Sequence, residues 1–398
     1  MIRAVGALLP GAVVLVAALV FWMVGGDAMV GNVAGTYGLV VYGAGFALAS
    51  VFHRSRAFIA LSALALLDIT VFGERDRTDL TLPMGTMVLG LLGVIAVIRD
   101  RGVVSRVGSL QVLGAGLLAA AVATFYSVPD RVARFAARPD MLPLEVVVWP
   151  GYPRITLAVA LFACLAAAYG LHRYRGPVER SLVWSVVLMM LAMHPSVGLG
   201  GASLFLVATG LTITLGVVET SYIMAYRDEL TGLPGRRALT QYLDGIAGTY
   251  TIAMVDVDHF KRFNDQHGHD VGDQVLRIVA GCLARAPGGG KAYRYGGEEF
   301  TLLYPGRKRG EALPHLEQVR ASVEQASFTL RSWKRPRKKP DGARTGKAKS
   351  TKARTLSVTV SIGMADTTGK DPTPESILKN ADRALYRAKK KGRNRIAR

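Results

Sequence analysis

Long apolar runs dominate the first 225 residues, and polar residues there gather in short intervening segments. A run of roughly twenty apolar residues is long enough to cross a bilayer as a helix. We expect about eight such spans, at residues 5–25, 30–52, 57–73, 82–98, 109–126, 155–172, 180–198 and 202–225. A cleaved signal peptide is the alternative for the first run, but its long apolar core and unconvincing cleavage pattern favour an uncleaved span.

From about residue 226 the pattern changes to short apolar runs that alternate with amphipathic stretches. These predict strands at about 251–256, 292–295, 300–304 and 356–362, and helices at about 236–246, 260–266, 272–285, 310–326 and 374–391. Such alternation indicates an α/β domain around one sheet. We therefore expect two domains, a multi-pass α-helical membrane domain at 1–225 and a soluble α/β domain at 226–398.

Composition agrees with this division. The chain of 398 residues is 50% hydrophobic and has a mean hydropathy of +0.27, yet it carries a net charge of +20. With eight spans, most basic loop residues of the first domain fall on one side, which predicts that both termini are cytoplasmic. These residues are Arg3, Arg54, Arg56, Arg99, Arg101, Arg106, Arg173, Arg175 and Arg180. The segment 127–154 on the other side carries three arginines, so the rule is imperfectly obeyed.

A basic segment at 331–354 interrupts the α/β domain. It holds eleven Lys and Arg residues and one acid, and it is predicted to be a loop inserted between two strands. Anionic lipid headgroups are the favoured partner, because each basic residue near such a surface contributes about 1 kcal/mol. A solvated loop and a nucleic-acid arm stay open as alternatives, although no nucleic-acid partner is expected.

A few polar residues in the apolar region and the two cysteines have separate interpretations. Asp68 lies within a span, which makes it a candidate for sensing an input, and His194 beside Pro195 is a weaker candidate. Cys164 and Cys282 support neither a disulfide nor a zinc site, and both are expected to be buried.

The most informative chemistry is the run Gly296-Gly297-Glu298-Glu299-Phe300 between two predicted strands. Glycines at such a turn allow positive φ and close approach to a ligand, and adjacent Glu side chains can bind a hard cation. Asp256 ends another apolar strand. If the strands bring Asp256 beside Glu298 and Glu299, cations must offset the repulsion, which outlines a two-metal site. For the pentapeptide alone, an exposed acidic hairpin is the alternative.

Five motifs occur in order along the second domain: Arg227–Arg237, Asp256–Asp273, Arg294–Phe300, Ser361–Gly363 and Ala381–Asn394. With these motifs, the chain from about Asp228 to Asn394 resembles the GGDEF family, diguanylate cyclases that condense two GTP molecules into cyclic di-GMP. The resemblance implies a palm-like, mainly antiparallel sheet flanked by helices. Together with the predicted spans and loop charges, it indicates an enzyme of the bacterial inner membrane whose catalytic domain is cytoplasmic.

The resemblance implies a role for each matching residue. Asp256 and Glu298, with the carbonyl of Val257, would bind two Mg²⁺ or Mn²⁺ ions per site, and Glu299 would assist the metals or the deprotonation of the attacking 3′-hydroxyl. Gly296 and Gly297 would let the backbone approach the substrate. The phosphates would contact the backbone amides of Phe260 and Lys261 and the side chains of Lys389 and Arg393.

The resemblance also implies that Asn264 and Asp273 recognise guanine, since a carboxylate accepts hydrogen bonds from N1 and the exocyclic amine of that base. From the residues alone, Asp273 could instead cap a helix that starts after Gly272, and Lys389 and Arg393 could form a solvated basic helix end.

The resemblance also implies that the enzyme acts as a homodimer, because each site holds one GTP and the ring closes only between two facing domains. One departure concerns product inhibition. Relatives often carry Arg-x-x-Asp five residues before the glycine pair, whereas this chain has Pro287-Gly288-Gly289-Gly290. The alternative to an active cyclase is a catalytically silent GGDEF receptor or scaffold that binds nucleotide or partners.

Overall fold

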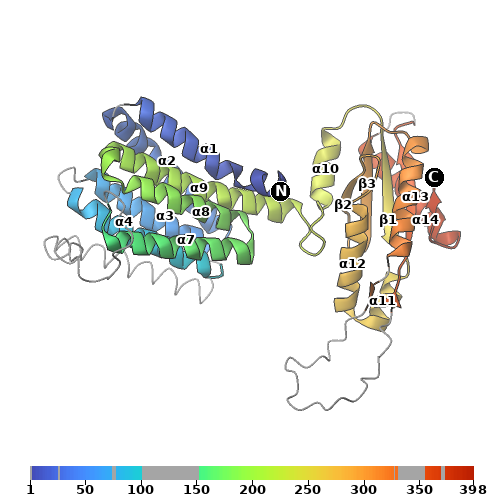
Figure 1. Ribbon diagram of the computed structural model, residues 1–398. Helices are drawn as coiled ribbons and strands as arrows, with labels where there is room; N and C mark the ends of the chain where they lie inside the picture. The colour runs from blue at the N-terminus through green and yellow to red at the C-terminus, as the bar shows by residue number, and fades with distance from the viewer. Residues whose placement is uncertain are drawn as a thin grey trace, which may run out of the picture. The chain divides into compact units, whose positions relative to one another are not determined.

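The computed structural model describes residues 2–25, 27–73, 78–100, 152–326, 328–329, 355–368 and 373–398. They form two compact units, Met1–Tyr222 and Ile223–Arg398 (Figure 1). The predicted span at 109–126 and the basic segment at 331–354 lie outside the described residues.

The first unit is a bundle of helices. In chain order its described elements are α1 (Ile2–Val24), α2 (Asp27–Val51), α3 (Ser55–Gly73), α4 (Thr78–Val97), α7 (Arg154–Tyr174), α8 (Pro177–Ala192), the 3₁₀ turn η2 (Pro195–Val197) and α9 (Gly198–Tyr226). The span predicted at 180–198 is wrong at its end, because α8 stops at Ala192. Pro195 has no N–H for a continuing helix and Gly198 has a φ of 73°.

The bundle has large apolar side chains on its outer surface as well as in its interior. Most of α9 is buried, as expected for a helix that is apolar all round. The more peripheral helices expose large apolar side chains, among them Leu9, Val13, Val16, Leu39, Val40, Leu161 and Leu165. Among the described residues, three helices are long and apolar enough to cross a membrane, Met29–Val51, Arg154–Tyr174 and Pro195–Tyr226.

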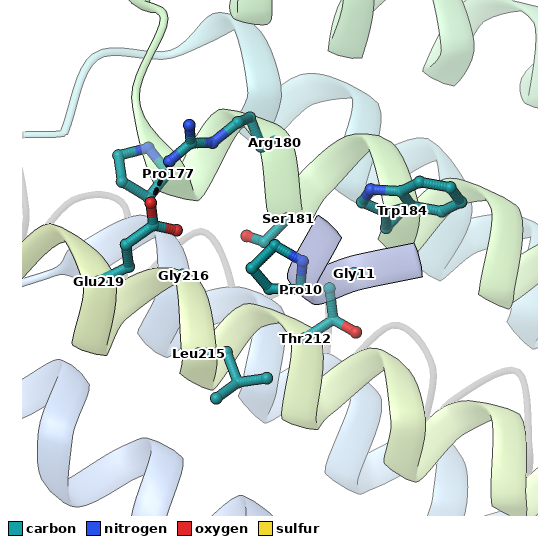
Figure 2. A pocket seen from close by; sticks show the side chains of 10 residues that line it. All are labelled: Pro10, Gly11, Pro177, Arg180, Ser181, Trp184, Thr212, Leu215, Gly216 and Glu219. Carbon is teal, nitrogen blue, oxygen red and sulfur yellow. Dashed lines mark hydrogen bonds and ion pairs between the residues drawn. The ribbon is translucent and has the colours of Figure 1, made fainter. Parts of the chain in front are cut away.

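Ion pairs join helix ends within the bundle. Arg56 at the start of α3 binds Glu179 in the first turn of α8, with Nη2 and Oε1 2.6 Å apart and both side chains almost buried. Arg54 lies 3.6 Å from Asp100, just beyond α4. Arg180 pairs with Glu219 at one edge of a small cavity that α1, α8 and α9 line (Figure 2).

The other residues singled out in this region have structural surroundings. Asp68 is buried and accepts a hydrogen bond of 2.5 Å from Ser203. The His194 ring accepts from the Ser196 amide and so caps η2. Cys164 is exposed, so the prediction that it is buried is wrong, because its face of α7 has no neighbouring helix in the described bundle; Cys282 is buried as predicted.

The second unit has a five-stranded mixed sheet of order β2-β3-β1-β6-β7. All its pairs are antiparallel except the parallel β6–β7 pair. The strands are β1 (Tyr250–Val257), β2 (Lys291–Arg294), β3 (Glu299–Pro305), β6 (Val360–Asp366) and β7 (Ile396–Ala397). A separate two-stranded sheet pairs β4 (Phe328–Thr329) with β5 (Thr355–Leu356). The predicted sheet flanked by helices is thus confirmed.

Helices cover both faces of this sheet. One core cluster joins it to α11 (Phe260–His267), α12 (His269–Leu283) and α13 (Arg309–Gln325), and another joins it to α10 (Arg236–Asp244) and α14 (Pro374–Lys390). Figure 1 shows α12, α13 and α14 running alongside the strands. The strand predicted at 356–362 is wrong in its bounds: the segment divides into β5 and β6, with residues 357–359 outside both.

Gly363 in β6 sets how closely α14 can approach the sheet. A Cβ there would lie 1.9 Å from the Leu385 amide and 2.2 Å from the Ala381 carbonyl oxygen, both backbone atoms of α14. No side-chain rotation can relieve such a clash, so only a glycine fits.

We therefore predict that Gly363→Ala separates α14 from β6 and destabilises the α/β unit by about 3 kcal/mol, the upper end for overpacked cores. Hydrogen exchange of β6 and α14 in the full-length protein should accelerate. Gly281→Ala is the matched control, because the nearest atom to its Cβ is the end of the Arg285 side chain at 3.8 Å. That helical substitution should slow exchange slightly, since Ala is favoured over Gly by about 0.5–1 kcal/mol. Unchanged exchange in Gly363→Ala would contradict the packing argument.

Candidate functional site

The site is built around the end of β1, the central strand. Every residue of β1 is buried, and Asp256, next to its last residue, has an exposed fraction of only 4%. In the register of the sheet, Asp256 lies opposite Glu299 of β3 on one side and Ser361 of β6 on the other. The Lys389 ammonium near the end of α14 lies 2.8 Å from Asp256 Oδ2. The sheet and α14 thus bring together four residues that are far apart in the sequence.

The hairpin between β2 and β3 places the two glutamates beside Asp256. The Val257 amide donates to the Glu298 carbonyl at 3.3 Å, while the Tyr295 and Gly296 amides donate to the Glu299 carbonyl. Neither Gly296 nor Gly297 adopts the positive φ that glycine allows. A Cβ at Gly296 would approach Glu299 Oε2 to 3.1 Å, a tight contact with the end of a side chain.

Negative charge is crowded at this point. Burial raises the pKa of Asp256 even though Lys389 and Arg393 oppose the shift. Burial, and then the charges of Asp256 and Glu299, raise the pKa of Glu298, with Lys389 acting against them. The carboxylates therefore leave a demand for positive charge that the side chains around them do not fully meet.

The predicted metal ligands fit a hard cation in their chemistry but do not form a complete cage. Asp256, Glu298 and Glu299 offer carboxylate oxygens, and Val257 at the strand end offers a carbonyl. Within the described ranges, however, no three His, Cys, Asp or Glu side chains converge closely enough to hold a metal ion by themselves. Magnesium commonly takes one or two protein carboxylates and completes its shell with water and substrate phosphates, so this donor set suits it.

The groups expected to bind phosphate lie at the same end of the sheet. The amides of Phe260 and Lys261 open α11, where no carbonyl of the helix can accept from them. Lys389 is half-buried at the end of α14, and Arg393 follows in the next turn, near enough for its charge to act on Asp256. Lys389 is thus not a freely solvated helix end, because it is engaged by a buried carboxylate.

The two residues expected to read guanine lie on neighbouring helices. Asn264 Oδ1 in α11 is buried without a hydrogen-bond partner in the described structure, and it abuts Gly272 of α12, where a Cβ would come within 1.9 Å. Asp273 follows Gly272 and is half-buried. The alternative that Asp273 caps the helix start is wrong, because α12 begins at His269 after Gly268.

Three comparisons with known proteins bear on this geometry. Residues 225–339 and 342–395 match the family model described as "Diguanylate cyclase, GGDEF domain". The C-terminal unit is a GGDEF domain. The chain is 35% identical over 187 residues to the response regulator PleD of Caulobacter vibrioides, and 36% identical over 173 residues to the diguanylate cyclase VdcA of Vibrio cholerae.

These matches cover 45% and 42% of this chain, and the chain spans 37% and 45% of the two relatives, less than half of either. Among solved structures, the GGDEF domain of DgcB from Caulobacter crescentus, in complex with c-di-GMP, is 34% identical. That match covers 44% of this chain and 92% of the other, with a TM-score of 0.36.

The GGDEF domain contains a buried carboxylate that the sequence analysis missed. Asp258 accepts hydrogen bonds from the hydroxyls of Thr359 at 2.7 Å and Ser361 at 2.6 Å, and from the Asn394 amide at 3.0 Å. The only sequence signal for a role of Asp258 beside the site was its position two residues after Asp256. Alternate residues at the end of a strand lie on the same face of the sheet.

A second missed feature anchors the hairpin. Arg294 Nη1 lies 2.8 Å from both carboxylate oxygens of Asp228, its Nε donates to the Gly296 carbonyl and its Nη2 to the Gly297 carbonyl. Desolvation alone would raise the pKa of Asp228, but hydrogen bonds from Thr231 and Arg294 outweigh it and lower that pKa below its ordinary value of 3.8. One guanidinium thus ties the start of the domain to the glycine pair.

We predict that Arg294→Lys loosens the hairpin, because an ammonium cannot make this forked set of contacts. Hydrogen exchange at residues 295–299 should accelerate in the full-length protein while α12 stays protected. Loss of protection throughout the domain would contradict a local role.

The anchor also predicts a pH dependence. Since the pKa of Asp228 is lower in the folded state, the anchor contributes its full stability above the unfolded pKa, near 3.8. This stability is lost as pH falls through the folded pKa. Asp228→Asn should therefore be less stable than wild type near neutral pH and should lose less stability on acidification, which unfolding midpoints measured at several acidic pH values would show.

Proposed function

We propose that this protein is a diguanylate cyclase that condenses two GTP molecules into cyclic di-GMP and two pyrophosphates. The observation that carries the proposal is the buried strand-end Asp256 beside the Glu298-Glu299 hairpin within a GGDEF domain. Relatives named diguanylate cyclases, such as VdcA, support the same activity.

Asp256, Glu298, Glu299 and the Val257 carbonyl would hold two Mg²⁺ or Mn²⁺ ions. When bound, such ions lower the pKa of the attacking 3′-hydroxyl and neutralise charge on the α-phosphate and the departing pyrophosphate. Lys389 and Arg393 bind the β- and γ-phosphates through charge-assisted hydrogen bonds, and the α11 amides of Phe260 and Lys261 bind from the other side. When the nucleotide binds, the Lys389 ammonium leaves its ion pair with Asp256 and contacts the phosphates instead.

Asn264 and Asp273 select guanine. The unpartnered Asn264 Oδ1 supports this role, because a buried oxygen without a donor is costly until a ligand supplies one. Gly272 leaves room for that side chain. The Asp273 carboxylate accepts from N1 and the exocyclic amine of guanine, a pair of donors that adenine lacks.

Catalysis requires a homodimer, because one site binds one GTP and each attacking hydroxyl must come from the other nucleotide. A cleft of about 580 Å³ beside Glu299 and Met254, lined by residues of α10 and α14, offers space on the Asp256 side of the sheet. Two such domains facing each other across a two-fold axis would bring both nucleotides together.

The helical unit anchors the enzyme in the bacterial cytoplasmic membrane. Its apolar outer surface supports this, because exposed apolar patches of such extent are unfavourable in water. The loop charges assign Arg54, Arg56 and Arg180 to the cytoplasmic side. Each of these arginines forms an ion pair with an acidic residue of another part of the bundle. Both termini and the GGDEF domain would then be cytoplasmic, where GTP is available and where the 331–354 segment can meet anionic headgroups.

Turnover of labelled GTP by the full-length protein in nanodiscs with Mg²⁺ tests the activity. Glu298→Ala and Glu299→Ala should each lower kcat by more than roughly 100-fold. Losing a residue that only supports a metal ligand already costs up to about that much, and these glutamates are proposed as ligands themselves. Glu229→Gln, an exposed carboxylate outside the hairpin, should retain wild-type turnover. Absence of cyclic di-GMP from folded wild-type dimers would favour the silent receptor instead.

Product feedback should be weak. Gly288 and Gly289 have φ values of 70° and 78°, and a Cβ at Gly290 would lie 2.8 Å from the Tyr304 ring, so this turn has no room for an Asp at the position of the Arg-x-x-Asp motif. We expect initial rates to show no strong noncompetitive inhibition when cyclic di-GMP is titrated. Such inhibition at product concentrations comparable to GTP would contradict this prediction.

A further inference from the structure

The turn after α14 has an uncommon backbone conformation. Gly392, Arg393 and Asn394 have φ values of 106°, 64° and 44°, so three residues in succession are left-handed. Glycine adopts this conformation freely, but Arg and Asn do so at a cost, and such residues persist only where their surroundings hold them. The turn joins the helix that carries Lys389 to β7, and its conformation decides where Arg393 emerges.

Asn394 is held from two sides. Its backbone amide donates to Asp258 Oδ2 at 3.0 Å. Its side chain accepts from Arg320 Nη1 at 2.6 Å and donates to Glu324 Oε1 at 2.7 Å. Both partners of the side chain lie in the last two turns of α13, a helix whose sequence shows no sign of a role in the site.

Arg320 is itself fixed in place. Its guanidinium pairs with Glu317 at 2.6 Å and with Glu324 at 2.7 Å, and the Arg320 side chain is only 15% exposed. A guanidinium held by two carboxylates on its own helix presents its remaining donor in one direction. That donor, on Nη1, forms the hydrogen bond to Oδ1 of the Asn394 side chain.

The other end of this arrangement reaches the reacting centre. Asp258 has its oxygens filled by Thr359, Ser361 and the Asn394 amide, so it cannot shift without breaking several hydrogen bonds. It lies two residues beyond Asp256. The Arg393 guanidinium is near enough for its charge to act on the Asp256 carboxylate. A continuous set of hydrogen bonds therefore runs from α13 to the turn that presents Arg393.

We propose that Arg320 is a positioning residue which, through Asn394, holds the 392–394 turn in its left-handed conformation and so directs Arg393 toward the phosphates of the bound nucleotide. The inference rests on the proposed function for the identity of that nucleotide. A purely structural Arg320 would stabilise α13 by a surface ion pair, which is worth little, and would leave nucleotide affinity unchanged.

Binding of a fluorescent GTP analogue and steady-state turnover, both with the full-length protein in nanodiscs, test the proposal. Arg320→Ala should raise the Kd and the KM about tenfold, the effect of losing roughly one charge-assisted hydrogen bond. The kcat should change by less than about threefold, because Arg320 touches no reacting atom. Asn394→Gly should behave alike, since glycine can adopt the left-handed conformation but, without either side-chain contact, is no longer held in it.

A double-mutant cycle separates positioning from general stability. In an Arg393→Ala background, Arg320→Ala should have no further effect on the Kd, because the residue that it positions is already gone. Glu317→Gln is the matched control: it removes the charge of one Arg320 partner but keeps an acceptor for the guanidinium, so the Asn394 contact stays and the Kd should be that of wild type. An equal loss of affinity in both backgrounds, or an unchanged Kd in Arg320→Ala, overturns the proposal.

The two readouts keep this proposal distinct from the cyclase itself. If wild type binds the analogue but forms no cyclic di-GMP, the proposed function fails while the Kd comparison still decides the role of Arg320. If wild type binds no guanine nucleotide under conditions in which the domain is folded, both proposals fail.

Discussion

The α/β unit depends on a carboxylate buried at the end of its central strand. Moving an ionised Asp into a protein interior is unfavourable unless a partner offsets the lost hydration. Asp256 has that partner in Lys389, 2.8 Å away, yet its pKa is still raised, so the ion pair compensates only in part. This residual cost leaves a demand for positive charge beside the facing hairpin, which the proposed divalent ions with a phosphate ligand would meet.

The position of Lys389 follows in turn from close packing elsewhere. Gly363 lets the backbone of α14 touch β6, and the helix then ends where its last turn can reach Asp256. Lys389 and Arg393 therefore depend on a glycine that is remote from the chemistry. The left-handed turn after α14 reverses the chain so that it continues as β7. Strand β7 then pairs in parallel with β6, the strand that contains Gly363.

Local sequence patterns predicted most helices and strands within a few residues, because apolar periodicity reflects which face each element buries. They failed where long-range contacts decide the outcome. Arg294 and Asp228 are 66 residues apart, and Asn394 and Asp258 are 136 apart, so no local pattern could pair them. The start of α12 also depends on a neighbour, Gly268, which precedes the helix with a φ of 84°. The strand pattern already grouped Asp256 with Glu298 and Glu299, whereas the proposed role of the Val257 carbonyl came only from the family motif.

The same contacts tie the hairpin to the helix that enters the domain. Tyr226 at the end of α9 accepts from the Gly235 amide, and Pro234 accepts from the Arg294 amide. The side chain of Arg294 then reaches Asp228 and both glycine carbonyls of the hairpin. The last turn of α9 and the glutamate-bearing loop are therefore joined by one short set of hydrogen bonds.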